Sequence, residues 1–189
     1  MDTLKAMQRV IDQTAKIVEG TKPSQLGNPT PCTDWTVRDV INHITGGSTM
    51  FAVCIEEGSC PDELLGQLVT GDNLGDDYKS AFRQAANRAL DAGHRKGALE
   101  KMVKLPFGEM PAGIALNLAV FDVTTHAADL AHATGQTIED TELLDTALEV
   151  GRQMIGSEMR QPKLFDPEQP APLNATAADR LLAFAGRRV

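Results

Sequence analysis

Three residues in two separate segments have the types and spacing of a metal site. In the segment GIALNLAVFDVTTHAADLAHATG, residues 113–135, Asp122 and His126 stand four positions apart. On a helix this spacing puts two side chains on one face, about 5 to 6 Å from each other. A carboxylate and an imidazole so placed can both reach one divalent ion, as the two histidines of an HExxH helix do. Their neighbours on this face are small and apolar, so burial would require a strong partner such as a metal.

His43, in an earlier segment, is the candidate third ligand. It lies in a predicted helix beginning at Thr36, and Gly47, four residues on, leaves room beside its ring. Three protein ligands leave one position for water or substrate, as in catalytic metal sites. Asp129, three residues after His126, is a candidate to orient that ring by accepting a hydrogen bond. A simpler interpretation stays open, in which the acid-xxx-His pair is an exposed helix contact and each histidine is merely packed.

The other reactive side chains are weaker candidates. His94 stands in a polar run, and His132 lies well away from the candidate site in helical angle. Cys54 is eleven residues beyond the first candidate histidine, about 16 Å along a helix, which is too far to share its metal. Cys32 is expected to be a small buried residue rather than a nucleophile. The chain has no P-loop, no G-x-S-x-G elbow and no CxxC motif.

Helices must position these side chains. Apolar periodicity, capping residues and glycine stops predict helices over residues 2–19, 36–55, 78–92, 111–133, 139–158 and 174–186. Residues 99–111 alternate weakly around Pro106, which predicts an extended or hairpin connection. Residues 58–77 look like a loop that can contain a short helix. The pattern predicts an all-α protein, an antiparallel helical bundle with a short extended connection and a short C-terminal helix.

Composition limits the classes of function. The chain has 189 residues, enough for one domain with its own core, and aromatic residues make up only 4%. Its net charge of −8 repels phosphate backbones and anionic lipids, so neither nucleic acid nor a membrane is an expected partner. The charged first segment does not resemble a signal peptide, and three cysteines form no disulfide framework. We therefore expect a cytoplasmic protein.

Three segments carry a family resemblance: PCTDWTVRDVINHITGG, FDVTTHAADLAHATGQ and DRLLAFAGR. Together they resemble an actinobacterial family within the DinB-like superfamily, whose fold is that of the metal-binding N-terminal domain of mycothiol-dependent maleylpyruvate isomerase. The resemblance implies an antiparallel four-helix bundle that binds a divalent metal, most often zinc. Carried over, the ligands are His43, Asp122 and His126. The expected organisation is a single domain over 1–189, with a proline-rich connector at 161–173 and a C-terminal helix at 174–189.

The sequence also departs from that family. The isomerase typically has glutamate where this chain has Asp122, and family members often carry tryptophan where Ala128 stands. The isomerase has a further C-terminal domain, which is not expected here. The resemblance favours a mycothiol-dependent transferase or isomerase, in which the metal activates the thiol toward an electrophilic substrate. A metal-dependent hydrolase and a non-catalytic metal or small-ligand binding module stay open, as does a homodimer.

Overall fold

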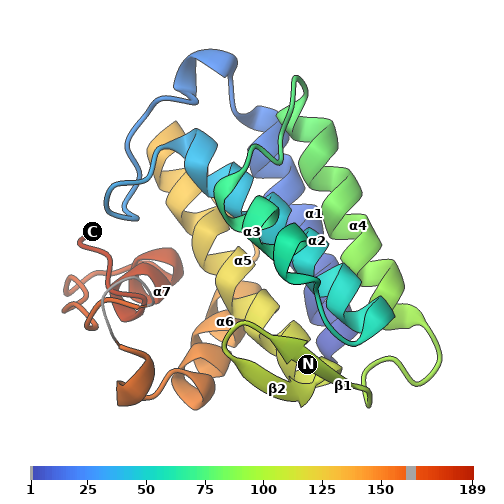
Figure 1. Ribbon diagram of the computed structural model, residues 1–189. Helices are drawn as coiled ribbons and strands as arrows, with labels where there is room; N and C mark the ends of the chain where they lie inside the picture. Colours follow the sequence, from blue (N-terminus) through green and yellow to red (C-terminus); the bar gives the residue numbers. More distant parts are fainter. Residues whose placement is uncertain (1, 161–164) are drawn as a thin grey trace.

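The computed structural model describes residues 2–160 and 165–189, and these are mostly helical (Figure 1). The elements in chain order are α1 (Thr3–Gly20), η1 (Pro23–Gln25), α2 (Val37–Glu57), α3 (Asp62–Thr70), α4 (Tyr78–His94), β1 (Met102–Leu105), β2 (Gly108–Pro111), α5 (Ala112–Thr134), α6 (Thr141–Met154), η2 (Ser157–Met159) and α7 (Ala177–Phe184). Within the described ranges, no helix combines the length and apolar character needed to cross a membrane.

The predicted signals set the start of α2 and the end of α5, whereas α2 runs past residue 55 to Glu57. The Thr36 hydroxyl accepts a hydrogen bond from the Asp39 backbone N–H, and the Asp39 carboxylate accepts one from the Thr36 N–H, so a capping box starts α2. The left-handed Gly58 ends this helix, and the left-handed Gly135 ends α5. Local sequence therefore sets where His43 lies along α2.

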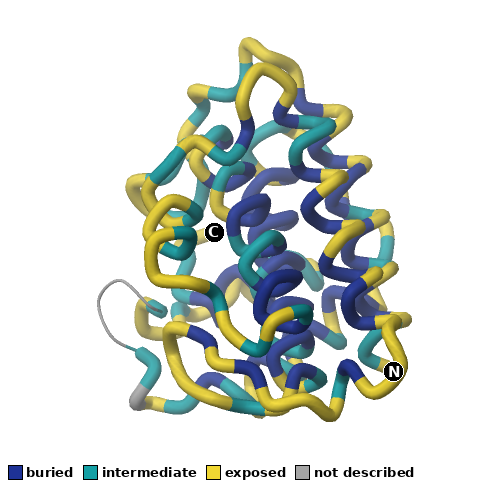
Figure 2. Tube along the Cα trace, turned by 45° about the vertical axis from the view of Figure 1, so that its right-hand side comes forward, coloured by how far each residue is buried: buried dark blue, intermediate teal, exposed yellow. Residues whose placement is uncertain are grey.

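The long helices pack side by side around one core. α2 packs against α4 and α5, and α1 packs against α4 and α5 as well. Figure 1 shows α6 and α7 beyond α5, where they contact it from the other side. Buried residues line the inner faces of the helices and exposed residues the outer faces (Figure 2). The largest fully buried side chains include Met7, Ile11, Ile41, Ile44, Phe82, Phe121 and Leu116.

The predicted extended connection is a small β-hairpin. β1 and β2 pair antiparallel, with Leu105 opposite Gly108, so only Pro106 and Phe107 form the loop. Gly108 has φ +139°, a conformation that other residues rarely adopt. The short helix anticipated in residues 58–77 is α3.

Two predicted helices are too long. The helix predicted over 139–158 is α6, which ends at Met154 and is followed by a separate short 3-10 turn. The helix predicted over 174–189 is α7, which occupies only eight of those residues, Ala177–Phe184. Its start is fixed by the side chain of Thr176, which caps the helix, and Gly186 with φ +93° turns the chain after it. Of the predicted connector, residues 161–164 lie outside the described residues, and residues 165–173 form neither helix nor strand.

Candidate metal centre

The structure brings the three predicted side chains together from two contacting helices. His43 lies on α2, and Asp122 and His126 lie on α5. One potential ligand atom from each lies within 4.8 Å of the other two. Asp122 stands between the histidines, with Oδ2 3.6 Å from His43 Nε2 and Oδ1 3.7 Å from His126 Nε2.

These separations suit three donors that surround one ion. Both nitrogen–oxygen distances exceed those of ordinary hydrogen bonds, which are about 2.7 to 3.2 Å. Two donor atoms, each about 2.1 Å from a tetrahedral ion, lie about 3.4 Å apart. Two imidazole nitrogens and one carboxylate oxygen are also a donor set that zinc accepts in catalytic sites. The residues therefore fit a divalent metal, and their role as its ligands is a proposal.

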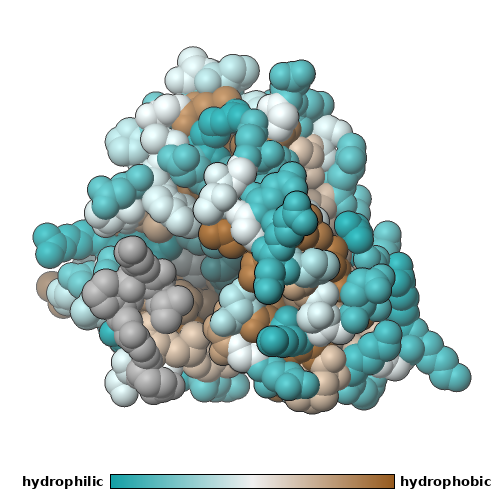
Figure 3. Space-filling model, in the orientation of Figure 1, coloured by the Kyte–Doolittle hydropathy of each residue, from teal (hydrophilic) through white to brown (hydrophobic). Residues whose placement is uncertain are grey.

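One side of this cluster is open. The side chains of His43 and Asp122 are 41% and 33% exposed, whereas that of His126 is 7% exposed. A Cβ added at Gly47 would meet no heavy atom within 4 Å, so the space beside His43 is free, as the sequence predicts. Figure 3 shows the surface hollowed between the C-terminal segment and α3, with hydrophilic side chains on the floor of the hollow. A small molecule can approach the cluster from its His43 and Asp122 side.

The cluster favours a charged carboxylate. Burial would raise the pKa of Asp122, but the two neighbouring histidines outweigh it and lower that pKa to about 2. Burial would lower the pKa of His43, but Asp122 outweighs it and the net pKa is raised. Asp122 is therefore ionised at neutral pH and supplies the negative charge that a divalent ion requires.

Asp129 contacts His126 on the side away from the cluster. Its carboxylate is fully buried, and Oδ2 lies 3.0 Å from His126 Nδ1. This is the contact that the helical spacing of the two residues predicts. The same carboxylate accepts hydrogen bonds from Arg187, in the C-terminal tail. The segment DRLLAFAGR, which carries part of the family resemblance, ends at this arginine, but the sequence assigns it no role because nothing in the tail indicates which helix it meets.

Trp35, which sequence reasoning also missed, covers both histidines. Its ring lies nearly parallel to that of His126, with 5.6 Å between centroids, and its centroid is 4.8 Å from that of His43. The loop that holds it is tied by hydrogen bonds from Trp35 N–H to the Cys32 carbonyl and from Thr30 N–H to the Trp35 carbonyl. The position of Trp35 directly before a predicted helix cap was the available signal.

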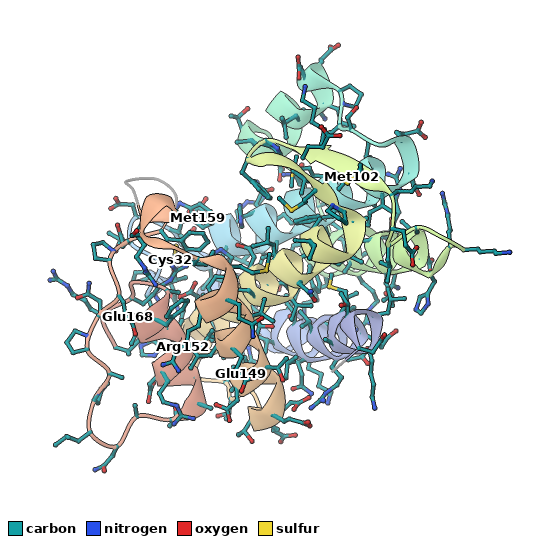
Figure 4. All side chains as sticks on the ribbon, turned by 90° about the horizontal axis from the view of Figure 1, so that it is seen from below. Cys32, Met102, Glu149, Arg152, Met159 and Glu168 are labelled. Carbon is teal, nitrogen blue, oxygen red and sulfur yellow. The ribbon has the colours of Figure 1, made fainter. Side chains whose placement is uncertain are left out.

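Cys32 belongs to a second group of possible ligands that shares His126 and Asp129. Figure 4 places Cys32 on the side of the molecule where the C-terminal segment lies. Burial raises the pKa of its thiol to about 11, so the thiol is protonated at neutral pH. Because Arg187 already occupies the Asp129 carboxylate, a second cation is disfavoured there. Cys32 is half-buried rather than fully buried, and a protonated thiol agrees with the prediction that it is no nucleophile.

The exposed histidines take no part in the site. His94 lies at the end of α4 and His132 in the last turn of α5, and both are exposed. Neither belongs to a possible metal-binding group found among the described residues.

Comparison with known proteins shows the family. The family model described as mycothiol maleylpyruvate isomerase N-terminal domain matches residues 7–131, about two thirds of the chain. The chain belongs to this family. The match includes all three candidate ligands and Asp129, and it ends well before Arg187.

The chain also has relatives in Mycobacterium tuberculosis that align over its full length. The uncharacterized proteins MT0763 and Rv0738, from two strains, are each 37% identical over 195 aligned positions, which cover 100% of both chains. Their names record no activity, so they point to no substrate.

Two solved structures have the same fold. They are mycothiol-dependent maleylpyruvate isomerase and a histidine-to-alanine mutant of it, with TM-scores of 0.62 and 0.65 and identities of 16% and 14%. Each alignment covers 78% of this chain and 65% of the isomerase chain. The chain thus spans just under two thirds of the isomerase, and at this identity the likeness concerns the fold alone.

Proposed function

We propose that the protein binds one divalent metal ion, zinc by preference, through His43, Asp122 and His126. We propose further that it uses the ion to activate a low-molecular-weight thiol, such as mycothiol, in a transferase or isomerase reaction on an electrophilic substrate. The observation that carries the proposal is the convergence of the three donors from α2 and α5. Membership of the mycothiol maleylpyruvate isomerase family supports the choice of thiol. Bound metal lowers the pKa of a coordinated thiol and stabilises the reactive thiolate.

The protein's own residues prepare this chemistry. Asp122, ionised between the two imidazoles, provides the negative charge of the site. Asp129 accepts a hydrogen bond at His126 Nδ1 and so turns the other ring nitrogen toward Asp122. Trp35 covers the histidines on one side and leaves the exposed edge of His43 for an incoming molecule.

We extend the proposal to the helical arrangement. The long helices α1, α2, α4 and α5 each contact two others of the set. We assign them as the four members of the antiparallel bundle implied by the sequence resemblance, with α6 and α7 as additions.

Cobalt substitution tests the thiol proposal. A thiolate that binds cobalt adds a charge-transfer band in the near ultraviolet, because sulfur is a softer ligand than water. We expect this band when mycothiol or a simpler thiol is titrated into the cobalt-loaded protein. His126→Ala, which removes one ligand, is the control and should show no band.

The outcomes of this experiment separate the alternatives. A cobalt spectrum that stays unchanged with every thiol tested would overturn the proposal of thiol activation. Metal-dependent hydrolysis, in which the open position holds water, would then be the next function to assay. A loaded protein that also lacks hydrolase activity would be a metal or small-ligand binding module.

A further inference from the structure

The C-terminal tail places Arg187 against Asp129, on the side of His126 that faces away from the candidate metal centre. After α7 the left-handed Gly186 reverses the chain, and the backbone N–H of Arg187 donates to the Leu182 carbonyl at 2.9 Å. The Arg187 Nη1 donates to the Ala185 carbonyl at 2.8 Å. These bonds hold both the backbone and the side chain of Arg187 in place against the end of α7.

The guanidinium of Arg187 donates two hydrogen bonds to the Asp129 carboxylate. Nη2 lies 3.1 Å from Oδ2 and Nε lies 3.4 Å from Oδ1, so the planar fork meets both carboxylate oxygens. The Arg187 side chain is 11% exposed, and that of Asp129 is 0% exposed. A carboxylate this deeply buried needs a partner, because an unpaired charge in the interior is strongly unfavourable. Within the described residues, Arg187 is the only cation bonded to Asp129.

The same carboxylate holds His126. Asp129 Oδ2 accepts from Arg187 and lies 3.0 Å from His126 Nδ1. Beside a guanidinium the carboxylate is an acceptor, so His126 Nδ1 must carry the proton that it donates. The lone pair of a neutral ring is then on Nε2, which faces Asp122 and is the atom a metal would bind.

We propose that Arg187 is a positioning residue for the metal centre, which acts through Asp129 to fix the orientation and tautomer of His126. This inference rests on the proposed metal site. The inference gives the C-terminal tail a role at that site, although the family match ends at residue 131 and does not include the tail. The competing explanation is that Arg187 only fastens the tail to α5 and has no effect on His126.

Zinc affinity in full-length variants distinguishes the two explanations. Arg187→Gln removes the cation, Arg187→Lys retains the charge without the fork, and Arg188→Gln changes the exposed neighbour as a matched control. Competition with a chromophoric chelator measures zinc binding, and circular dichroism verifies that each metal-free variant is folded. We expect Arg187→Gln to weaken zinc binding roughly 10-fold, at the lower end of the effect of losing a partner that orients a ligand, because Asp129 itself remains. We expect Arg187→Lys to recover part of this loss, and Arg188→Gln to match wild type.

A second measurement reports the ring of His126 directly. The nitrogen chemical shifts of a histidine distinguish the two neutral tautomers, and we expect Nδ1–H in metal-free wild type and a mixture in Arg187→Gln. Unchanged zinc affinity and unchanged ring shifts in a folded Arg187→Gln would overturn the inference, even if that variant melts earlier. Wild-type protein that binds no zinc would overturn the proposed function instead, while the ring shifts would still decide whether Arg187 orients His126.

Discussion

Asp122 is the residue on which metal retention should depend most, because it is the anionic member of the cluster. We expect Asp122→Asn to weaken metal binding by at least about 100-fold, more than the loss of a group that only orients a ligand. Trp35 provides the measurement, since it is the only tryptophan and lies against both histidines. Cobalt should quench its fluorescence in wild type at far lower concentration than in Asp122→Asn.

The matched control for this change is Asp145→Asn. Asp145 is an exposed acid on α6 that pairs with Arg180, away from the site. It should bind cobalt as wild type does. Equal quenching curves for wild type and Asp122→Asn would show that the ion does not bind at this carboxylate.

The pair of His43 and Asp122 gives the metal-free protein a defined pH dependence. The pKa of His43 is raised, so its contribution to stability is full below its ordinary pKa of about 6.5 and is lost as pH rises through the native pKa. The pKa of Asp122 is lowered to about 2, so its contribution is full above its ordinary pKa of about 3.9 and is lost as pH falls from there through about 2. The pair therefore stabilises the fold most between about pH 4 and 6.5.

Urea unfolding in the presence of a chelator measures this window. We expect the stability difference between wild type and His43→Gln to be larger at about pH 5.5 than at about pH 8.5. A His43→Gln difference that grows toward alkaline pH would contradict the sign of the His43 shift.

The sequence was sufficient to predict the convergence of the candidate ligands but not their surroundings. Helical spacing alone places Asp122, His126 and Asp129 on one face, and the family resemblance supported His43 as the third ligand. Trp35 and Arg187 reach the site through a loop and a tail. The positions of these segments against α5 depend on hydrogen bonds between residues far apart in the chain, from Asn28 to the Ala133 carbonyl and from Arg187 to Asp129. No local periodicity encodes such paths, so the contacts of these two residues became visible only in three dimensions.

At the level of elements, we expect alanine substitutions at two adjacent glycines of α2 to change the stability of the fold in opposite directions. A Cβ at Gly46 would lie 2.5 Å from the Leu68 backbone oxygen and 2.7 Å from Asn73 Nδ2, so α2 and the end of α3 would have to separate. A Cβ at Gly47 would enter open space. We expect Gly46→Ala to destabilise the fold by about 1 to 3 kcal/mol, as overpacking does. We expect Gly47→Ala to stabilise it by about 0.5 to 1 kcal/mol, since alanine is the better helix former.

Chemical denaturation of the two metal-free variants checks this contrast. Each serves as the other's control, because the substitution and the helix are the same and only the neighbours differ. Equal stability of Gly46→Ala and Gly47→Ala would mean that α3 is not packed as closely on α2 as the structure has it.

Element prediction succeeded where a strong cap or a left-handed glycine bounds an element, and it failed at a weaker boundary. The start of α2 at the Thr36 cap and the end of α5 at Gly135 follow directly from residue chemistry. The hairpin was predicted from alternation around Pro106, which agrees with its two-residue loop. The helix predicted over 139–158 ran too far, because the prediction did not use Gly156 as a stop; this glycine has φ −81° and lacks the left-handed conformation of Gly58 and Gly135. There the chain leaves the helix at Ile155 with φ −97° and ψ 92°.

At the scale of the molecule, α5 is the helix around which the rest assembles. Figure 1 shows it between the long helices on one side and α6 and α7 on the other. Phe121 of α5 packs against Phe184 of α7, and Gly151 of α6 leaves the space that these rings need. A helix that is packed on most sides is apolar around most of its circumference, so the few polar residues of α5 stand out in its sequence. Asp122, His126 and Asp129 remain in that setting because each has a charged or hydrogen-bonding neighbour.

Removal of metal should weaken the whole molecule without unfolding it. The apolar core extends over all the long helices and does not include the candidate ligands, so folding does not depend on the ion as it does in a zinc finger. Metal at 100 times its dissociation constant stabilises a protein by about 2.7 kcal/mol. In a chain of this size, 1 kcal/mol shifts the melting temperature by about 2 to 4 °C. We therefore expect a chelator to lower the melting temperature by roughly 5 to 10 °C and to leave the helical circular-dichroism signal intact.

Asp122→Asn should melt at the same temperature with and without chelator, which separates metal removal from any direct effect of the chelator. A chain that loses its helical signal on chelation would instead require the metal for folding, and the ion would then have a structural role.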